Sequence, residues 1–175
     1  MGIRLIHAET ERIIRRYGTR DPYALLDAIG AVVRVSDAYP ADGLKGYCTI
    51  LNRCMYAVIN GKLCETDRKI AAGHEAAHLI LHRDRILASP VKTMRDFNLY
   101  DSSGRAEREA NSFLADFLVA DEDVLDITAA ADDYFTAASR LHIPAPLFAF
   151  KLYSMMRRGY PLRTPVDPDS KFLGR

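Results

Sequence analysis

The sequence lacks the features that mark membrane-spanning, exported and disulfide-linked proteins. No apolar run approaches the roughly 18 residues that a membrane-spanning helix needs. The N-terminal stretch MGIRLIHAETERIIRRYG interrupts its apolar positions with charges at every turn, which a signal peptide does not do. There are only three cysteines, Cys48, Cys54 and Cys64, and their spacings match no common zinc pattern. These absences predict a cytoplasmic protein whose reduced thiols serve as small core side chains.

A large net charge, internal repeats and low-complexity tracts are also missing. The formal net charge is +1, so no global electrostatic field draws the chain to nucleic acid or to an anionic membrane. With 175 residues, 49% of them hydrophobic, the chain is long and apolar enough for one domain with a core. We predict a single domain over residues 1–160 and a flexible, proline-containing tail over residues 161–175.

Apolar periodicity predicts a mainly helical α+β domain with a small antiparallel sheet packed on one of its helices. The segment from residue 84 to residue 104 shows no regular pattern and is expected to be irregular. The other expected elements are helices over 3–17, 22–30, 66–82 and 105–119, a helix that begins within DEDVLDIT (121–128), a strand over 31–35, two strands around a turn at Asn52 and Arg53, and two helices within 132–160 separated by HIPAP.

The segment AAGHEAAHLILH, residues 71–82, carries the most informative motif of the chain. On a helix, His74 and His78 lie about 40° apart and one turn along the axis, so both rings can reach one ion. Glu75 lies about 100° around the helix, where it can take a proton from a water molecule at the metal and later pass it to a leaving amine. The pattern therefore predicts zinc bound by the two histidines, with Glu75 as the general base.

An ordinary buried helix is the alternative interpretation of this motif. The two imidazoles could then be satisfied by backbone carbonyl groups. The neighbouring small residues, Ala71 to Gly73 with Ala76 and Ala77, predict close packing and a buried helix. Unpaired imidazoles would be costly there, so we favour metal binding.

A hydrolytic zinc usually has a third protein ligand, and the helix GRAEREANSFLADFLV offers two candidates. Glu107 falls about 50° from the centre of the apolar face, whereas Glu109 falls about 110° away and is expected to be solvated. Asn111, one turn beyond Glu107, can orient a carboxylate or a histidine through a hydrogen bond. We predict Glu107 as the third ligand. The alternatives that stay open are Glu109, Asp96, Asp101 and His82.

His82 continues the histidine stripe, two turns after His74. It lies about 12 Å along the axis, too far to share an ion with His74. We expect a helix-end histidine, which the helix dipole favours, with a supporting role at the metal or in the substrate cleft as the alternative.

Taken together, HEAAHLILH and EREANSFLADFLV resemble the ImmA/IrrE family of metallo-endopeptidases. The active-site helix of that family reads HExxH, and a following helix carries Glu–x–x–Ala–Asn–x–Phe, which Glu107, Ala110, Asn111 and Phe113 match. The resemblance covers about residues 20 to 155. It implies a zincin-like fold, Zn²⁺ held by His74, His78 and Glu107, and Glu75 as the catalytic base.

The resemblance also implies a biological setting. Members of the family typically act inside bacteria, beside a helix-turn-helix repressor of a mobile element, prophage or stress regulon. Cleavage of that repressor switches genes on. The expected partner is therefore a protein substrate of this kind, with no membrane and no direct nucleic-acid binding expected.

Two other functions compete with hydrolysis. The segment 135–160 loosely resembles a helix-turn-helix, in which several basic residues could contact phosphates. Alternatively, the chain could sequester a repressor through a structural zinc, although such an adaptor would not need Glu75. The basic residues concerned are Arg140, His142, Lys151, Arg157 and Arg158.

Overall fold

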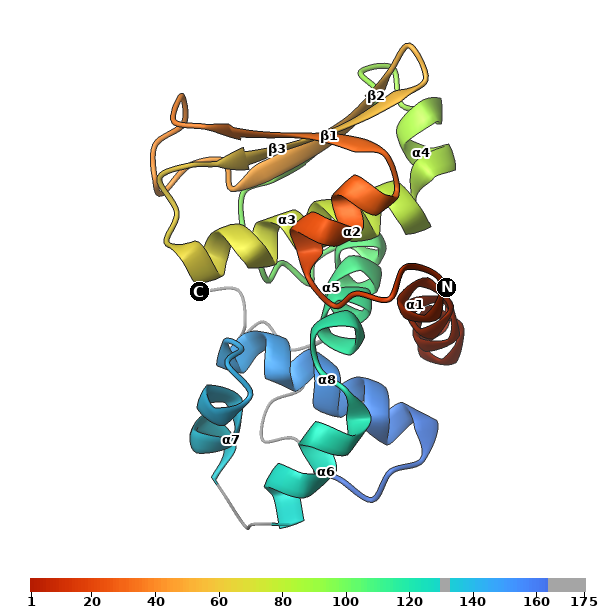
Figure 1. The fold of residues 1–175 in the computed structure, drawn as a ribbon, viewed down its shortest axis with the longest axis vertical. Coiled ribbons are helices and arrows are strands. Elements are labelled where there is room, and N and C mark those ends of the chain that lie inside the picture. The colour runs from red at the N-terminus through yellow and green to blue at the C-terminus, as the bar shows by residue number, and fades with distance from the viewer. Residues whose placement is uncertain (130–132, 164–175) are drawn as a thin grey trace. The chain divides into compact units, whose positions relative to one another are not determined.

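The computed structural model of the chain describes residues 1–129 and 133–163 (Figure 1). These residues form two compact units. We call residues 17–99 the sheet unit, and residues 1–16 together with the chain from Tyr100 onward the helical unit. The predicted α+β class is confirmed. One domain over 1–160 stays a prediction, and most of the predicted tail, residues 164–175, lies outside the described residues.

The helical unit is held together by an apolar core between two long helices, α5 and α8. Phe113 and Phe117 stack along α5 with ring centroids 5.9 Å apart, and Phe148 and Phe150 of α8 are fully buried beside them in the core. The N-terminal helix adds Ile6 and Ile13. The helices of this unit are α1 (Ile3–Tyr17, ending one residue into the sheet unit), α5 (Arg105–Leu118), α6 (Asp121–Ala129), α7 (Tyr134–Arg140) and α8 (Ala145–Arg158).

The sheet unit packs a four-stranded sheet against the helix α3, as Figure 1 shows. The strand order is β1-β3-β2-β4. β1 pairs with β3 in parallel and the other neighbours are antiparallel. The sheet is thus mixed and not antiparallel, because the chain crosses from β1 to the far side of β3 before the β2–β3 hairpin forms. The elements are α2 (Pro22–Ala28), β1 (Ala31–Ser36), β2 (Gly46–Leu51), β3 (Cys54–Asn60), α3 (Glu65–Leu81), α4 (Arg83–Ala88) and β4 (Thr93–Asp96).

The hairpin between β2 and β3 has the predicted two-residue turn. Asn52 and Arg53 have φ values of 50° and 67°, as a type I′ turn requires at both central positions. The turn pairs Leu51 with Cys54. It therefore sets the register of β2, the strand that lies beside the histidine helix.

Helix α3 begins one residue earlier than expected because Cys64 caps it. The sulfur of Cys64 accepts a hydrogen bond from the backbone N–H of Asp67 at 3.4 Å. Cys54 and Cys64 are exposed, so the prediction of core cysteines holds only for Cys48, which is buried. The small residues of α3 are almost fully buried, as predicted, and let the helix lie close to the sheet.

The prediction of irregular structure between residues 84 and 104 is wrong for two segments. The short helix α4 and the strand β4 lie there. β4 has four residues and forms by antiparallel pairing with β2. A strand this short has no recognisable alternation of its own. It matters because it carries Asp96 to the histidine helix.

Among the described residues, none of the helices has both the length and the apolar character needed to cross a membrane.

Candidate metal centre

The three residues predicted for the chemistry of α3 are completely buried. His74, Glu75 and His78 each have 0% exposure. The Nε2 atoms of the two histidines lie 3.0 Å apart. Two ligands of a tetrahedral zinc, each about 2.0–2.1 Å from the ion, would be roughly 3.3 Å apart. The helix thus holds both rings close to the spacing that one ion needs.

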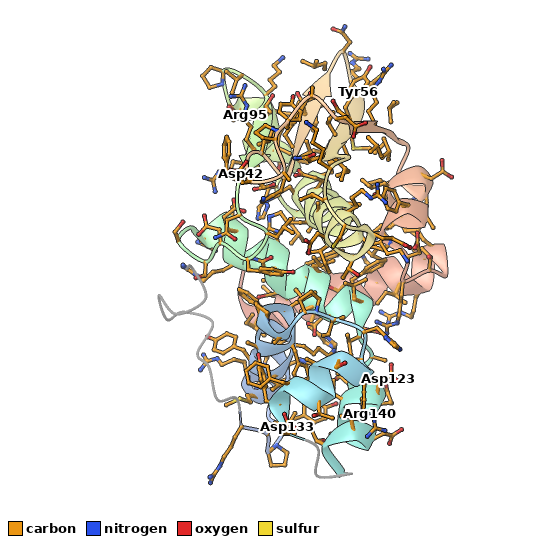
Figure 2. All side chains as sticks on the ribbon, turned by 90° about the vertical axis from the view of Figure 1, so that its left-hand side faces the viewer. Asp42, Tyr56, Arg95, Asp123, Asp133 and Arg140 are labelled. Carbon is orange, nitrogen blue, oxygen red and sulfur yellow. The ribbon has the colours of Figure 1, made fainter. Side chains whose placement is uncertain are left out.

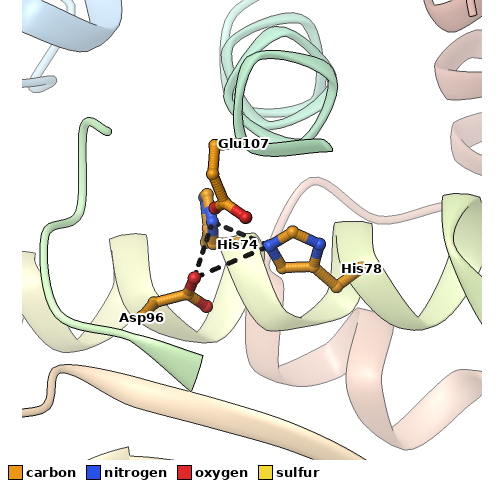
Figure 3. Close-up of side chains that lie close together, drawn as sticks. All are labelled: His74, His78, Asp96 and Glu107. Atoms are coloured by element: carbon orange, nitrogen blue, oxygen red, sulfur yellow. Dashed lines mark hydrogen bonds and ion pairs between the residues drawn. The ribbon is translucent and has the colours of Figure 1, made fainter. Parts of the chain in front are cut away.

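A carboxylate from β4 joins the two histidines. Asp96 Oδ1 lies 3.6 Å from His74 Nε2 and 3.8 Å from His78 Nε2. The ligand atoms of these three residues all lie within 4.8 Å of one another. Figure 3 shows the three side chains pointing toward one another from α3 and β4. The sheet unit therefore supplies a set of two histidines and one carboxylate by itself.

The environment of Asp96 favours a cation. Its side chain is 5% exposed, and among the described residues its Oδ2 atom has no hydrogen-bond partner. Burial would raise the pKa of this carboxyl group, but hydrogen bonding and charge from His74, with His78 beyond, lower it below its usual range. A buried, ionised carboxylate without full hydrogen bonding is costly, and a divalent ion would neutralise it.

The carboxylate of Glu75 lies against β2. A Cβ atom on Gly46 would stand 2.7 Å from Glu75 Oε1. The thiol of Cys48 faces the same carboxylate, and burial followed by the charge of Glu75 raises the pKa of that thiol well above its ordinary value. The general-base candidate is thus enclosed by the sheet on one side and lies on the same helix as the two histidines.

His82 caps α3 at its C-terminal end, as predicted, and also contacts the site. Its Nδ1 atom is 2.9 Å from Nδ1 of His78. When His78 binds a metal through Nε2, the proton of the neutral ring sits on Nδ1, so His78 donates to His82. Such a contact fixes the ring orientation of a metal ligand, and the supporting role left open for His82 is the one that its geometry favours.

The other predicted residues belong to the helical unit. Glu107 lies in the first turn of α5 and is half-buried. Asn111 is fully buried, and its side-chain amide donates to the backbone carbonyl of Asp101 at 2.9 Å. It therefore ties the segment before α5 to the helix. Their roles toward a metal stay predictions.

The expectation that Glu109 faces solvent is wrong. The residue is 8% exposed and accepts a hydrogen bond from Arg105 Nε at 2.8 Å. The helical wheel misplaced it because a wheel centred on the largest apolar residues ignores the packing of α1 and α8 around the helix. Glu109 is engaged in an ion pair of the helical unit.

The donor set fits a divalent transition metal. Neutral imidazoles suit zinc, copper, iron and nickel, and carboxylate oxygens complete such sites. All three donors of the sheet unit are buried, which removes competing water from the ligands. The adjacent carboxylate of Glu75 adds a proton acceptor. Together, these residues can bind a Lewis-acidic ion and transfer a proton beside it.

A comparison with family models matches residues 27–153 to the IrrE N-terminal-like domain, Peptidase_M78. The chain belongs to the IrrE N-terminal-like family. The matched range contains α3, β4 and α5, and hence every residue of the candidate centre. Membership in this peptidase family implies a metallopeptidase, and the cluster of His74, His78 and Asp96 agrees with it.

A curated relative of this IrrE-like chain is the "Uncharacterized immunity region protein 2" of Bacillus phage phi105. The two are 30% identical over 117 residues, which covers 67% of this chain and 70% of the relative. No solved structure matches the chain.

Proposed function

We propose that the chain is a zinc-dependent endopeptidase that hydrolyses a peptide bond in a protein substrate, and that this substrate is a helix-turn-helix repressor. The observation that carries the proposal is that the buried side chains of His74, His78 and Asp96 converge beside the buried carboxylate of Glu75. The chain that holds them belongs to a peptidase family. A structural site would need the donors, but it would not need a second buried carboxylate next to them.

The two histidines are the ligands of the ion, and acidic side chains complete the set. When bound, zinc would polarise the scissile carbonyl group and acidify a water molecule. Glu107, which Figure 3 also draws, is the ligand that we expect from the helical unit, because its helix position and the resemblance both favour it. A hydrolytic site keeps one position open. We therefore expect only one of the two carboxylates, Asp96 or Glu107, to hold the ion during the reaction.

Glu75 carries the proton chemistry. Its carboxylate accepts a proton from the attacking water molecule and delivers it to the leaving amine. His82 keeps the ring of His78 in the tautomer whose Nε2 is free for the ion. The burial of all three side chains strengthens these interactions, because the local dielectric is low.

The proposed substrate class rests on the relatives. The phage phi105 relative is named an immunity region protein, and the ImmA/IrrE resemblance associates such peptidases with repressors of mobile elements. An endopeptidase that cleaves a repressor would act in the cytoplasm, where the repressor is found.

The test is to incubate the purified chain with the helix-turn-helix regulator encoded beside it and to identify fragments by mass spectrometry. We expect one zinc per chain and cleavage at a defined bond. Glu75→Gln should retain the zinc and lose about 10²–10⁴-fold in rate, the usual contribution of a general acid–base group. Undiminished cleavage by Glu75→Gln would remove the base from the mechanism.

The DNA-binding alternative loses two of its candidate residues. Lys151 is 1% exposed and bonds to Asp116 and Asp121, and Arg158 is bonded to Asp121. These cations are engaged within the helical unit. A gel-shift assay with random duplex DNA at low salt would detect any DNA binding through the other basic residues.

A further inference from the structure

We propose that Gly46 on β2 is the residue that positions the catalytic carboxylate of Glu75. The inference rests on the proposed endopeptidase function. It adds a residue of β2 to a site whose other residues in the sheet unit lie on α3 and β4.

The carboxylate occupies the space that a side chain at position 46 would fill. A Cβ atom there would lie 2.7 Å from Glu75 Oε1 and 3.4 Å from Glu75 Cδ. Real Cβ atoms essentially never approach another atom as closely as the first of these distances. Only a glycine at this position leaves the observed place of the carboxylate free.

Space, and not backbone conformation, is what requires the glycine. Gly18, Gly30 and Gly159 have positive φ values, and Gly46 does not belong to that group. Its backbone lies in an ordinary strand that any L-residue can adopt. A glycine within a strand weakens it and often marks the close approach of another group, and here that group is the side chain of Glu75.

The strand cannot easily move away from an added methyl group. β2 lies between two strands, with Gly46 opposite Ile59 of β3 and opposite Asp96 of β4. The same added Cβ would also stand 3.2 Å from the backbone carbonyl oxygen of Val58. Since the backbone is held on both sides, the carboxylate end of the Glu75 side chain is the part that must shift.

The shift would act on the base and leave the metal ligands in place. The three nearest atoms that the added Cβ would meet belong to Glu75 and Val58, and none of them belongs to His74, His78 or Asp96. A displacement of about 1 Å in a reacting group can cost roughly 100-fold in rate. A substitution at Gly46 should therefore change the position of the base without changing the binding of the ion, and this difference can be tested.

The experiment compares Gly46→Ala in the full chain with the wild type and with Glu75→Asp, using a proteome-derived peptide library as substrate and mass spectrometry as the readout. We expect Gly46→Ala to lower the cleavage rate by about 100-fold while zinc affinity stays within a few-fold of wild type. In the Glu75→Asp background, whose carboxylate is one methylene shorter, the same change should cost less than about 10-fold. An equal loss in both backgrounds would overturn the proposal, and so would wild-type cleavage by Gly46→Ala.

Gly61→Ala is the matched control. An added Cβ at Gly61 would stand 2.1 Å from Asp37 Oδ1, so it creates a similar clash with a carboxylate in the same unit. The nearest atoms that it would meet belong to Asp37 and Val35 and not to the candidate metal centre. We expect this variant to cleave the library at the wild-type rate. A loss of cleavage equal to that of Gly46→Ala would show a general effect of strain and overturn the proposal.

Thermal unfolding separates failure of this inference from failure of the proposed function. Gly46→Ala should lower Tm by roughly 3–10 °C, the range that overpacking costs in a chain of this size. In the Glu75→Ala background the same substitution should lower it by much less. If the wild type cleaves nothing, the endopeptidase proposal fails. The comparison of the two Tm changes, in the wild-type and Glu75→Ala backgrounds, still decides whether Gly46 makes room for Glu75.

Discussion

The two units both bury charged side chains, but in one of them the charges satisfy each other. In the helical unit, Lys151 donates to Asp116 at 3.1 Å and to Asp121 at 2.7 Å. Ser154 also donates to Asp116, at 2.7 Å, and Arg158 holds Asp121 through Nη2 at 2.7 Å. Each carboxylate therefore has a cation and more than one hydrogen bond.

In the sheet unit, the buried polar groups do not satisfy each other completely. Asp96 Oδ1 lies 3.6 Å from His74 Nε2 and 3.8 Å from His78 Nε2, and Asp96 Oδ2 has no hydrogen-bond partner among the described residues. Lys151 and Asp116 are as deeply buried as the two histidines and Asp96, so burial of polar groups does not distinguish the clusters. What distinguishes the candidate site is a set of ligand atoms that an external cation would complete.

The largest expected effect comes from removing a histidine ligand. His74→Ala should lower zinc affinity by about 1,000-fold or more, beyond the 10- to 100-fold loss usual for a supporting residue. Zinc should then no longer raise Tm, since stabilisation by a ligand follows its affinity. Chelator competition and thermal unfolding with and without zinc measure this. The exposed His142, replaced by Asn to suit its φ of 54°, is the control; a similar loss there would point to nonspecific binding.

The next effect should appear in the other unit. Lys151→Met leaves the buried Asp116 without its lysine, and breaking a buried ion pair in this way costs about 3–5 kcal/mol. Tm should fall by roughly 6–20 °C, with zinc affinity unchanged. Arg157→Met, an exposed cation on the same helix, should change Tm by less than about 2 °C. Equal stability of the Lys151 and Arg157 variants in urea titrations would contradict the contrast between the units.

Asp96→Asn should give the opposite pattern to Lys151→Met. Zinc affinity should fall by about 100-fold, because a charged donor is lost. The metal-free variant should be at least as stable as the metal-free wild type, because a buried, incompletely bonded charge is removed. Arg95→Ala, the exposed neighbour on β4 (Figure 2), should retain full affinity. A metal-free Asp96→Asn protein less stable than wild type would mean that Asp96 is part of a self-satisfied network.

The smallest effect should be the acid sensitivity of the helical unit. Burial works against ionisation of Asp121, but hydrogen bonds from Arg158 and Lys151 hold its pKa well below its usual range, and the pKa of Asp116 is lowered as well. Carboxyl groups of lowered pKa stabilise the fold above the unfolded-state pKa of about 3.9, and this stability is lost as the pH falls through the folded-state values. Tm should therefore decline steadily below about pH 4. The decline should be shallower in Asp121→Asn, and equal slopes in both proteins would exclude this carboxylate as a cause.

Much of the candidate site was predictable because it is local. His74, Glu75 and His78 lie on one helical segment, where spacing along the chain determines direction in space. The turn at Asn52 and Arg53 and the helices on both sides of HIPAP were predictable for the same reason. The same helical geometry favours Glu107, whose role toward a metal stays a prediction.

Asp96 and Gly46 could not be singled out from the sequence. Asp96 was one of several open alternatives, because β4 is too short to show a pattern and becomes a strand only by pairing with β2. No local pattern marks Gly46, because the carboxylate that lies against it belongs to Glu75 of α3. Each depends on a register between segments that lie far apart in the chain.

By itself, the sequence determined the helix that carries His74, Glu75 and His78 and the class of the fold, because these follow from periodicities of a few residues. Only the tertiary structure decided which acid of the sheet meets the two imidazoles, which strand makes room for the base, and which buried charges neutralise each other. Those outcomes follow from close packing between distant segments, in which the position of one backbone sets the space left for another's side chain.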